Sequence, residues 1–421
     1  MTRGSESVAH GGVVDRSDVG PGPGAWDFVA PPVIRLGAGR VAETGEVAAA
    51  LGRRAWLVGG RRGLLDGATR GRIEEALGAA GLTAEVVAVA SGEPTVDQVA
   101  GALAGLPSGS RDGVVIVAVG GGSAIDLGKA LAALATNLPA GLAAAEYDEG
   151  IVDRLEGMGR GIPIATAPLP VVALPTTFGT GAEATRNAVI ACPRRRFKKS
   201  LRSPLMVPRA VIVDPDLGRG CPPDVAAAAG LDCVTQLVEA FICRVRRPLP
   251  RALVVDALPR ALQALPRVVA DPSDAEARAA MAHAALLSGL ALANAGLGLA
   301  HGVAAPLGVE CGTPHGVACG LLLPVALGVN APAAAADYAV LERTLDPGAR
   351  GADAAGSFVD RIGRLCAEVS AAAGLPRRLR DVGLARDRIG WLADHSGGAS
   401  MRGNPVQLDP GELRTVLEAA W

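Results

Sequence analysis

Two histidines stand out because the chain contains only five, and because both lie in one glycine-rich, otherwise apolar segment, GLGLAHGVAAPLGVECGTPHGVACG. His301 and His315 are each followed by a glycine. Neutral imidazole together with a carboxylate is a common ligand set for zinc or iron. A single histidine in an apolar helix is more often a hydrogen-bonded core residue. The pair therefore points to a metal site only if a carboxylate lies beside it.

Such a carboxylate is available in the segment GLDCVTQLVEAF. If this segment is helical, Asp232, Gln236 and Glu239 fall at i, i+4 and i+7 on one face, opposite an apolar face. Two interpretations remain open. The polar face is exposed to solvent, or it is turned towards the histidines as part of a site.

A nucleotide-binding loop is indicated where the strand pattern VVIVAV runs into three glycines and then into the helical pattern LGKALAALA. Glycines let backbone N–H groups approach a pyrophosphate, and the helix N-terminus behind them favours its negative charge. Ser123 and Asp126 have the spacing of a capping box, which starts the helix at the loop. An ordinary strand-to-helix turn remains the alternative.

A second loop of this kind occurs in VVALPTTFGTGAEATRNAVI, where Thr176, Thr177 and Thr180 follow a strand pattern. Their hydroxyls and the small residues around them are suited to ribose and phosphate, although a hydroxyl-capped turn has the same composition. The presence of both loops in one chain favours nucleotide binding.

A basic run follows the second loop. It either steers an anionic substrate towards the site or forms a solvated hairpin. The residues concerned are Arg194, Arg195, Arg196, Lys199 and Arg202.

The order of apolar segments predicts the elements that position these residues. From Trp26 to about residue 217, short apolar runs alternate with longer helical patterns, as in parallel strands covered on both faces by crossover helices. After VIVDPDLGRGCPPD, helical patterns follow one another. We therefore predict an α/β dinucleotide-binding domain with a parallel sheet over 25–217 and an all-helical metal and substrate domain over 218–421. Residues 1–24, rich in glycine, serine and charge, are predicted to form a disordered tail.

Composition excludes several classes of protein. A formal net charge of -1 provides no basic field for nucleic acid or an anionic membrane. The seven cysteines contain no C-x-x-C pair, which argues against a zinc ribbon or disulfide framework and for a reducing compartment. There is no signal-peptide pattern and no long uninterrupted apolar run. We expect a soluble, cytoplasmic protein that binds neither nucleic acid nor membrane.

Taken in this order, the segments above resemble the iron-containing alcohol dehydrogenase family over nearly the whole chain, from about Trp26 to Trp421. The resemblance implies a dehydroquinate synthase-like fold, NAD or NADP as cofactor, a divalent metal ion (iron or zinc) and a homodimer. It implies contacts to the pyrophosphate and nicotinamide portion from Gly121, Gly122, Ser123 and Asp126. It also implies nucleotide contacts from Thr176, Thr177 and Thr180, with Lys198 near the nicotinamide ribose.

The choice between NAD and NADP is expected to depend on the end of the second strand. Family members that prefer NAD have an acidic residue there, whose carboxylate accepts hydrogen bonds from the ribose 2′-OH. This chain has Gly60 at that place, followed by Arg61 and Arg62. The missing carboxylate and the two cations favour NADP.

The metal ligands of the family are an aspartate, a histidine four residues later, and two further histidines. Asp232, His301 and His315 match, but Gln236 takes the place of the first histidine. A carboxamide is a weak ligand, so we expect a lower affinity for iron or zinc, although three ligands and an open position are a set that catalytic zinc uses. Ala305 replaces a further histidine that is associated with proton relay in the family.

The resulting prediction is an NAD(P)-dependent, metal-dependent alcohol dehydrogenase or aldehyde or ketone reductase. The ion would polarise the substrate oxygen while hydride passes to or from the nicotinamide. The substrate is a small-molecule or peptide alcohol or carbonyl compound, including a β-hydroxy acid that loses CO₂ after oxidation. The alternatives are a metal-free reductase resembling maleylacetate reductases, a lyase or cyclase resembling dehydroquinate synthase, and a noncatalytic binding protein.

Overall fold

The first half of the chain is built on a parallel sheet. The computed structural model describes residues 25–64, 67–349 and 353–421, so the predicted tail over 1–24 lies outside the described residues. Six strands pair in the order β1-β8-β5-β4-β2-β3, and every neighbouring pair is parallel. The strands are β1 (Val33–Leu36), β2 (Arg54–Gly60), β3 (Thr83–Ala90), β4 (Val114–Gly120), β5 (Val171–Pro175) and β8 (Ala210–Val213).

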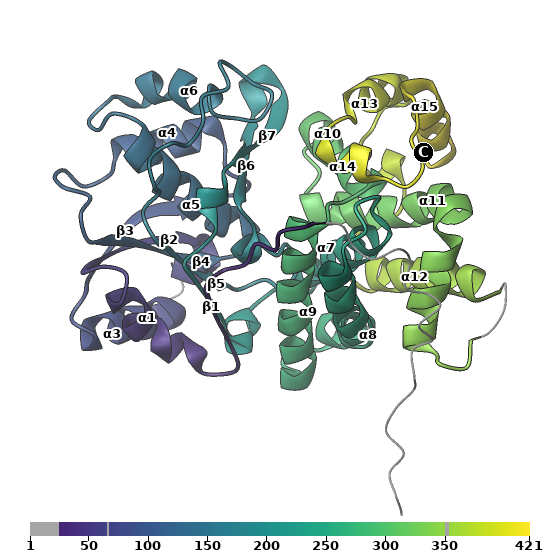
Figure 1. The fold of residues 1–421 in the computed structure, drawn as a ribbon, viewed down its shortest axis with the longest axis horizontal. Helices are drawn as coiled ribbons and strands as arrows, with labels where there is room; N and C mark the ends of the chain where they lie inside the picture. The colour runs from purple at the N-terminus through teal and green to yellow at the C-terminus, as the bar shows by residue number, and fades with distance from the viewer. Residues whose placement is uncertain (1–24, 65–66, 350–352) are drawn as a thin grey trace, which may run out of the picture.

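Helices cover both faces of this sheet, α1 and α3 on one and α4, α5 and α6 on the other (Figure 1). Successive residues of β4 alternate between the two cores: Ile116 packs with α4 and α5, whereas Val117 packs with α3. Burial on both faces explains why the strands are continuous apolar runs without polar alternation. The helices are α1 (Thr44–Ala49), α2 (Arg61–Leu64), α3 (Gly67–Ala79), α4 (Val96–Ala104), α5 (Gly122–Asn137) and α6 (Ala144–Val152).

A separate antiparallel hairpin contains the basic run. It consists of β6 (Asn187–Cys192) and β7 (Phe197–Arg202). Arg194 binds Asp97 and Asp148, while Arg195 and Arg196 form ion pairs with other carboxylates. The hairpin interpretation of this run is therefore confirmed, and its arginines are paired within the chain.

The second half of the described chain is helical. No strand occurs after Val213 among the described residues. The helices are α7 (Pro223–Ile242), α8 (Pro248–Ala270), α9 (Ala275–Asn294), α10 (Leu299–Cys311), α11 (His315–Leu345), α12 (Asp353–Ala372), α13 (Ile389–His395), α14 (Ala399–Gly403) and α15 (Pro410–Ala419). The predicted fold class, a parallel α/β part followed by an all-α part, is confirmed.

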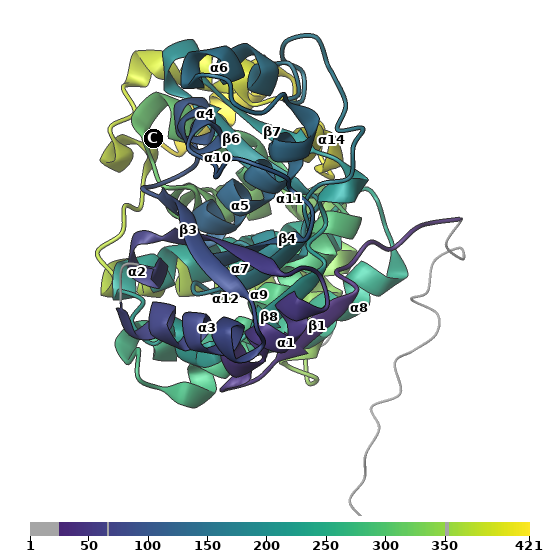
Figure 2. The same cartoon turned by 90° about the vertical axis from the view of Figure 1, so that its left-hand side faces the viewer.

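An apolar cluster joins the two halves. Residues of α5, β5 and β8 pack against α9, with Val211 and Leu286 among them. Viewed from the side of the sheet, the helical part lies behind the strands (Figure 2).

Two helices of the second half are long and apolar enough to span a membrane by length and mean hydropathy, namely α7 and α11. The bent pair α9 and α10 passes the same test when taken together. In α7, 83% of the apolar window is buried inside the structure, and in α11 56%. Their apolar residues are therefore used largely for the helical core.

Strand order fixes where a ligand can bind. From β2 the chain crosses to β3 on one side, whereas from β4 it crosses to β5 on the other side. Between β2 and β4 the sheet therefore has a topological switch point, and ligands of open α/β sheets bind at the carboxyl ends of the strands there. These ends are Gly60 and Gly120.

Candidate active site

The two strand ends are in close contact. Gly120 has φ +149°, and a Cβ on it would lie 3.0 Å from the backbone nitrogen of Gly60 and 2.7 Å from the Cβ of Ala124. Only glycine fits both the positive φ and this approach. By contrast, a Cβ on Gly60 would meet only the Cβ of Ala124, at 4.0 Å.

The glycine loop and the threonine loop pack directly against each other. The backbone N–H of Thr176 donates to the Gly120 carbonyl at 3.0 Å. A Cβ on Gly121 would lie 2.9 Å from Thr177 Oγ1, and one on Gly122 would lie 2.7 Å from Thr180 Oγ1. The two segments predicted to contact the nucleotide thus form one surface at the switch point.

Helix α5 begins at this surface without the predicted capping box. Its N-cap is Gly121, and no side chain caps it. Asp126 is occupied elsewhere: Oδ2 accepts from the Val189 N–H at 3.0 Å, and Oδ1 pairs with Lys129 Nζ at 2.9 Å. The capping box of Ser123 and Asp126 is therefore wrong. The uncapped N–H groups of the first turn remain available to an anion.

Lys129 is a structural residue that the sequence analysis did not single out. Its side chain is fully buried. The ammonium donates to the Ala182 carbonyl at 2.7 Å, to Thr185 Oγ1 at 2.9 Å and to the Asn187 carbonyl. It therefore ties α5 to the end of the threonine loop and to the hairpin. Its position three residues after Asp126 on a helix was the available signal.

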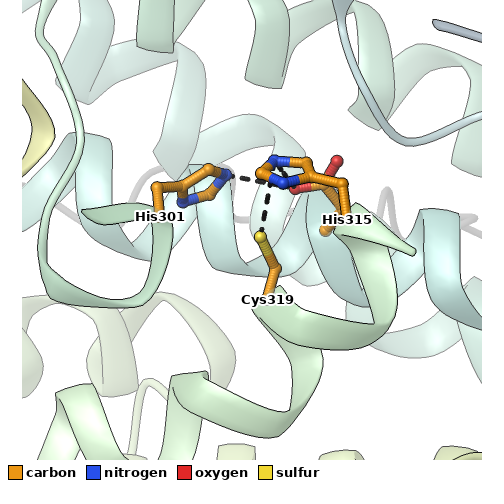
Figure 3. A group of neighbouring side chains, drawn as sticks. His301, His315 and Cys319 are labelled. Atoms are coloured by element: carbon orange, nitrogen blue, oxygen red, sulfur yellow. Dashed lines mark hydrogen bonds and ion pairs between the residues drawn. The ribbon is translucent and has the colours of Figure 1, made fainter. Parts of the chain in front are cut away.

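Three helices bring the predicted metal ligands together. Asp232 is on α7, His301 on α10, and His315 opens α11. Asp232 Oδ1 lies 3.1 Å from His301 Nε2 and 4.0 Å from His315 Nε2. Figure 3 shows the two imidazoles approaching each other, with ring centroids 5.4 Å apart.

A cysteine completes this cluster. Cys319 lies one turn after His315 on α11, and its Sγ is 3.6 Å from His315 Nε2 (Figure 3). One ligand atom from each of Asp232, His301, His315 and Cys319 lies within 4.8 Å of the others. The sequence analysis missed Cys319, although its i+4 spacing from His315 was visible.

The polar face of α7 is buried rather than solvated. Asp232, Gln236 and Glu239 are each 1 or 2% exposed. The interpretation of this face as a solvent-exposed surface is therefore wrong.

Gln236 lies beside the cluster rather than in it. Its Oε1 accepts from the Ser288 hydroxyl at 2.8 Å, and its Nε2 donates to the Thr180 carbonyl at 3.2 Å. Both polar atoms of the carboxamide have partners outside the donor set, and the side chain also hydrogen-bonds to the carboxylate of Asp232 within it. Through Thr180, Gln236 connects α7 to the threonine loop.

Glu239 orients His301. Its Oε2 lies 2.7 Å from His301 Nδ1, and because a carboxylate only accepts, the Nδ1–H donates. The same carboxylate accepts from the N–H groups of Gly298 at 2.9 Å and Ala300 at 2.6 Å, at the start of α10. The Nε2 atom of His301 is thereby directed at Asp232, as in carboxylate–histidine–metal arrangements.

The charges of the cluster suit a cation. Burial opposes ionisation of Asp232, but the hydrogen bond from His301 and the neighbouring histidines outweigh it and lower the pKa of this carboxyl. Burial also disfavours a charged His301, yet Cys319, Asp232 and Glu239 raise its pKa well above the usual value. A metal ion at His301 therefore replaces a proton.

His315 is neutral at physiological pH. Desolvation lowers its pKa to about 4, and the charge of nearby Lys198 acts in the same direction. Its Nδ1 is buried without a hydrogen-bond partner. An uncharged imidazole whose Nε2 faces a carboxylate, beside a second imidazole, fits a divalent ion by the chemistry of its donors.

Two further predicted positions flank the cluster. Lys198 forms a 2.6 Å ion pair with Glu93, and only 7% of its side chain is exposed. Both charges of this pair act on His315. Ala305 follows one turn after His301 on α10 and offers no group for proton relay.

Comparison with known proteins agrees with this arrangement. The model of the iron-containing alcohol dehydrogenases matches residues 31–215, and that of the C-terminal part of the Fe-containing alcohol dehydrogenase family matches residues 226–421. Lactaldehyde reductase of Escherichia coli (strain K12) is 30% identical over 354 residues, which cover 83% of this chain and 87% of the reductase.

Solved structures agree as well. A 1,3-propanediol oxidoreductase aligns with a TM-score of 0.83 at 29% identity, over 94% of this chain and 100% of that one. A sulfoacetaldehyde reductase from Bifidobacterium kashiwanohense, in complex with NAD+, aligns with a TM-score of 0.79 at 28% identity. The alignment covers 94% of this chain and 99% of the reductase.

These matches confirm the predicted oxidoreductase activity, and none of them supports the cyclase or the metal-free alternative. The family combines a nicotinamide dinucleotide with iron or another divalent metal. With both halves matched, the chain belongs to the iron-containing alcohol dehydrogenase family and is an NAD(P)-dependent oxidoreductase acting on alcohols or aldehydes.

Proposed function

We propose that Asp232, His301 and His315 hold a divalent ion beside a bound dinucleotide, and that this site interconverts an alcohol and its aldehyde or ketone. The observation that carries the proposal is the convergence of the three side chains from three helices, with Asp232 Oδ1 within 3.1 and 4.0 Å of the two imidazoles. When bound, the ion would supply a Lewis acid for the substrate oxygen.

The dinucleotide is assigned to the surface at the switch point. Its pyrophosphate would accept hydrogen bonds from the N–H groups at the start of α5, next to Gly121, Gly122 and Ser123. Thr176, Thr177 and Thr180 would contact the nucleotide, and Lys198 the nicotinamide ribose. Support comes from the packing of the two loops and from the charge of Lys198 reaching His315. Asp126 would act indirectly, by anchoring α5 to the hairpin.

Residues behind the ligands would keep them in position. Glu239 fixes the ring of His301 so that Nε2 remains a lone-pair donor. Gln236 joins α7 to Ser288 and to the threonine loop, which couples the ion to the cofactor surface. Rigid placement of this kind lowers the cost of bringing hydride donor and acceptor together.

NADP is the proposed coenzyme. Gly60 ends β2 with no carboxylate, and exposed Arg61 follows it at the start of α2. A carboxylate at this place would hydrogen-bond a 2′-OH and repel a 2′-phosphate, whereas arginine attracts the phosphate.

The proposed substrate is a small-molecule or peptide alcohol or carbonyl compound, and the proposed assembly is a cytoplasmic homodimer. The cysteine pattern, seven residues without a C-x-x-C pair, supports a reducing compartment.

The test compares metal content and carbonyl-dependent oxidation of NADPH in the wild type, His315→Ala and a control, His283→Ala. His283 lies on α9, partly exposed and paired with Asp256, so its loss should leave both readouts unchanged. His315→Ala should lose the metal and the turnover. If His315→Ala keeps both, or if the metal-free wild type turns over, the assignment is refuted.

A further inference from the structure

The fourth donor of the cluster has no counterpart in the expected ligand set. Cys319 is fully buried on α11, and its sulfur faces the same space as His315 Nε2 and Asp232 Oδ1. Its sulfur also interacts with the ring of His301. Cys319 also packs in the apolar cluster of α10 and α11, but its sulfur contacts two imidazoles and lies near a carboxylate, as a metal ligand would.

Two of the donor separations match those of a tetrahedral zinc ion, and all four donor atoms lie within 4.8 Å of one another. With Zn–S of about 2.3 Å and Zn–N of about 2.05 Å at the tetrahedral angle, sulfur and nitrogen lie about 3.6 Å apart, and two light donors about 3.3 Å apart. Cys319 Sγ and His315 Nε2 are 3.6 Å apart, and His301 Nε2 and Asp232 Oδ1 are 3.1 Å apart. The 4.0 Å between His315 Nε2 and Asp232 Oδ1 requires only a small adjustment.

The replacement of a ligand histidine by Gln236 explains why an additional ligand such as a thiolate would be needed. With the carboxamide bound to Ser288 and Thr180, the set provided by Asp232, His301 and His315 lacks one ligand relative to the family pattern. A thiolate supplies a strong donor and a second negative charge from the other side of the cluster. Soft sulfur ligands favour zinc, whereas carboxylate and imidazole sets accept iron as well.

We propose that Cys319 is a direct metal ligand, replacing the histidine that Gln236 displaced, and that the set Asp232, His301, His315 and Cys319 selects zinc over iron. The thiol loses its proton to solvent when the ion binds. This inference rests on the proposed function, since it concerns the same ion.

The cluster remains accessible on one side. Asp232 and His301 have side-chain exposures of 1 and 6%, whereas 31% of the His315 side chain is exposed. A substrate oxygen would therefore approach past His315, and zinc can accept a fifth ligand when it does so.

X-ray absorption of the zinc-loaded full-length protein tests the proposal without mutation. The expected spectrum contains one sulfur neighbour at about 2.3 Å in addition to the nitrogen and oxygen shell. Substitution with Co²⁺ gives a second readout, because a thiolate ligand produces a sulfur-to-cobalt charge-transfer band in the near ultraviolet. A zinc shell of nitrogen and oxygen alone overturns the proposal.

Variants then assign the sulfur. Cys319→Ser and Cys319→Ala should lose the sulfur shell and the cobalt band. Their zinc affinity, measured by chelator competition, should fall by at least about 100-fold, since even outer-shell partners are worth 10- to 100-fold. Cys366→Ser is the matched control, because Cys366 is also a buried thiol but lies on α12 outside the donor set. It should keep both signals, and loss of the sulfur signal in this control alone would overturn the assignment.

The two proposals fail in different ways. If the wild type binds no metal, the proposed function fails and the role of Cys319 fails with it. If the wild type binds zinc that depends on His315 but not on Cys319, the proposed function stands and only the present inference is overturned.

Discussion

Glu239→Gln is the substitution whose consequences the structure defines best. The carboxylate is 1% exposed and accepts three hydrogen bonds, one at Oε1 and two at Oε2. A glutamine must place its NH₂ group at one of these two positions. At Oε1 it faces the N–H of Ala300, and at Oε2 it faces the N–H of Gly298 and the ring of His301. No orientation satisfies all three donors.

The two orientations have different costs. Facing Ala300, the NH₂ group leaves buried donors unpaired, which costs about 1–3 kcal/mol of folding stability. Facing His301, it makes Nδ1 an acceptor and moves the ring proton to Nε2, where it blocks the metal. Loss of such an orienting partner weakens metal binding roughly 10- to 100-fold, or about 1.4–2.8 kcal/mol.

The assay measures zinc affinity by chelator competition and stability by urea unfolding of the metal-free protein. Glu342→Gln is the control, because Glu342 is equally buried and accepts from Arg361 at 2.6 and 3.1 Å, away from the cluster. It should lower stability but leave metal affinity unchanged. The reasoning is refuted if Glu239→Gln binds zinc like the wild type, or if both variants lose affinity equally.

Three further outcomes are expected. Gly60→Asp should shift preference from NADPH to NADH, as measured by the ratio of kcat/KM values, because the new Cβ has room and its carboxylate repels a 2′-phosphate; an unchanged ratio would place the ribose elsewhere. Gly122→Ala should raise the Kd for the dinucleotide about tenfold, because the new Cβ would lie only 2.7 Å from Thr180 Oγ1. The control Gly101→Ala in α4, whose new Cβ would have no atom within 4 Å, should leave the Kd unchanged. Burial raises the pKa of Glu183 from 4.5 to about 7, so the folded protein keeps this proton up to a higher pH than the unfolded chain does. The free energy of unfolding should therefore fall by roughly 3 kcal/mol as pH rises from about 5 to about 8. Urea unfolding across this range should be flatter for Glu183→Gln, and an equal slope would show that another group is responsible.

The fold could be predicted because its signal is local. Strands buried on both faces are continuous apolar runs, as in β2 and β4, and the switch to helical periodicity after β8 is visible in the sequence. The capping box failed for a tertiary reason. The spacing of Ser123 and Asp126 is correct, but the carboxylate reaches Lys129 and the N–H of Val189, a partner 63 residues away. No local sequence pattern reveals that the Val189 N–H competes for the Asp126 carboxylate.

The candidate site divides in the same way. Asp232 and the two histidines could be selected by residue type and by resemblance, and helical spacing was visible for Asp232, Gln236 and Glu239. The exposure of the polar face of α7 depends on which elements pack against it. The periodicity of the sequence does not reveal those elements. Glu239 was visible on that face, but its role follows only from the start of α10 lying above it.

Cys319 and Gln236 illustrate the limit most clearly. Each looks unremarkable in sequence: a cysteine one turn after a histidine, and a polar residue on a polar helix face. Their relation appears only when α7 and α11 are in contact, because the donor lost from one helix is then matched by a donor on the other. A substitution at a ligand position therefore cannot be judged along the chain alone. When a ligand is lost, the residues that surround its former position decide the outcome. The site either loses its metal ion or binds a different ion, one that accepts a sulfur ligand.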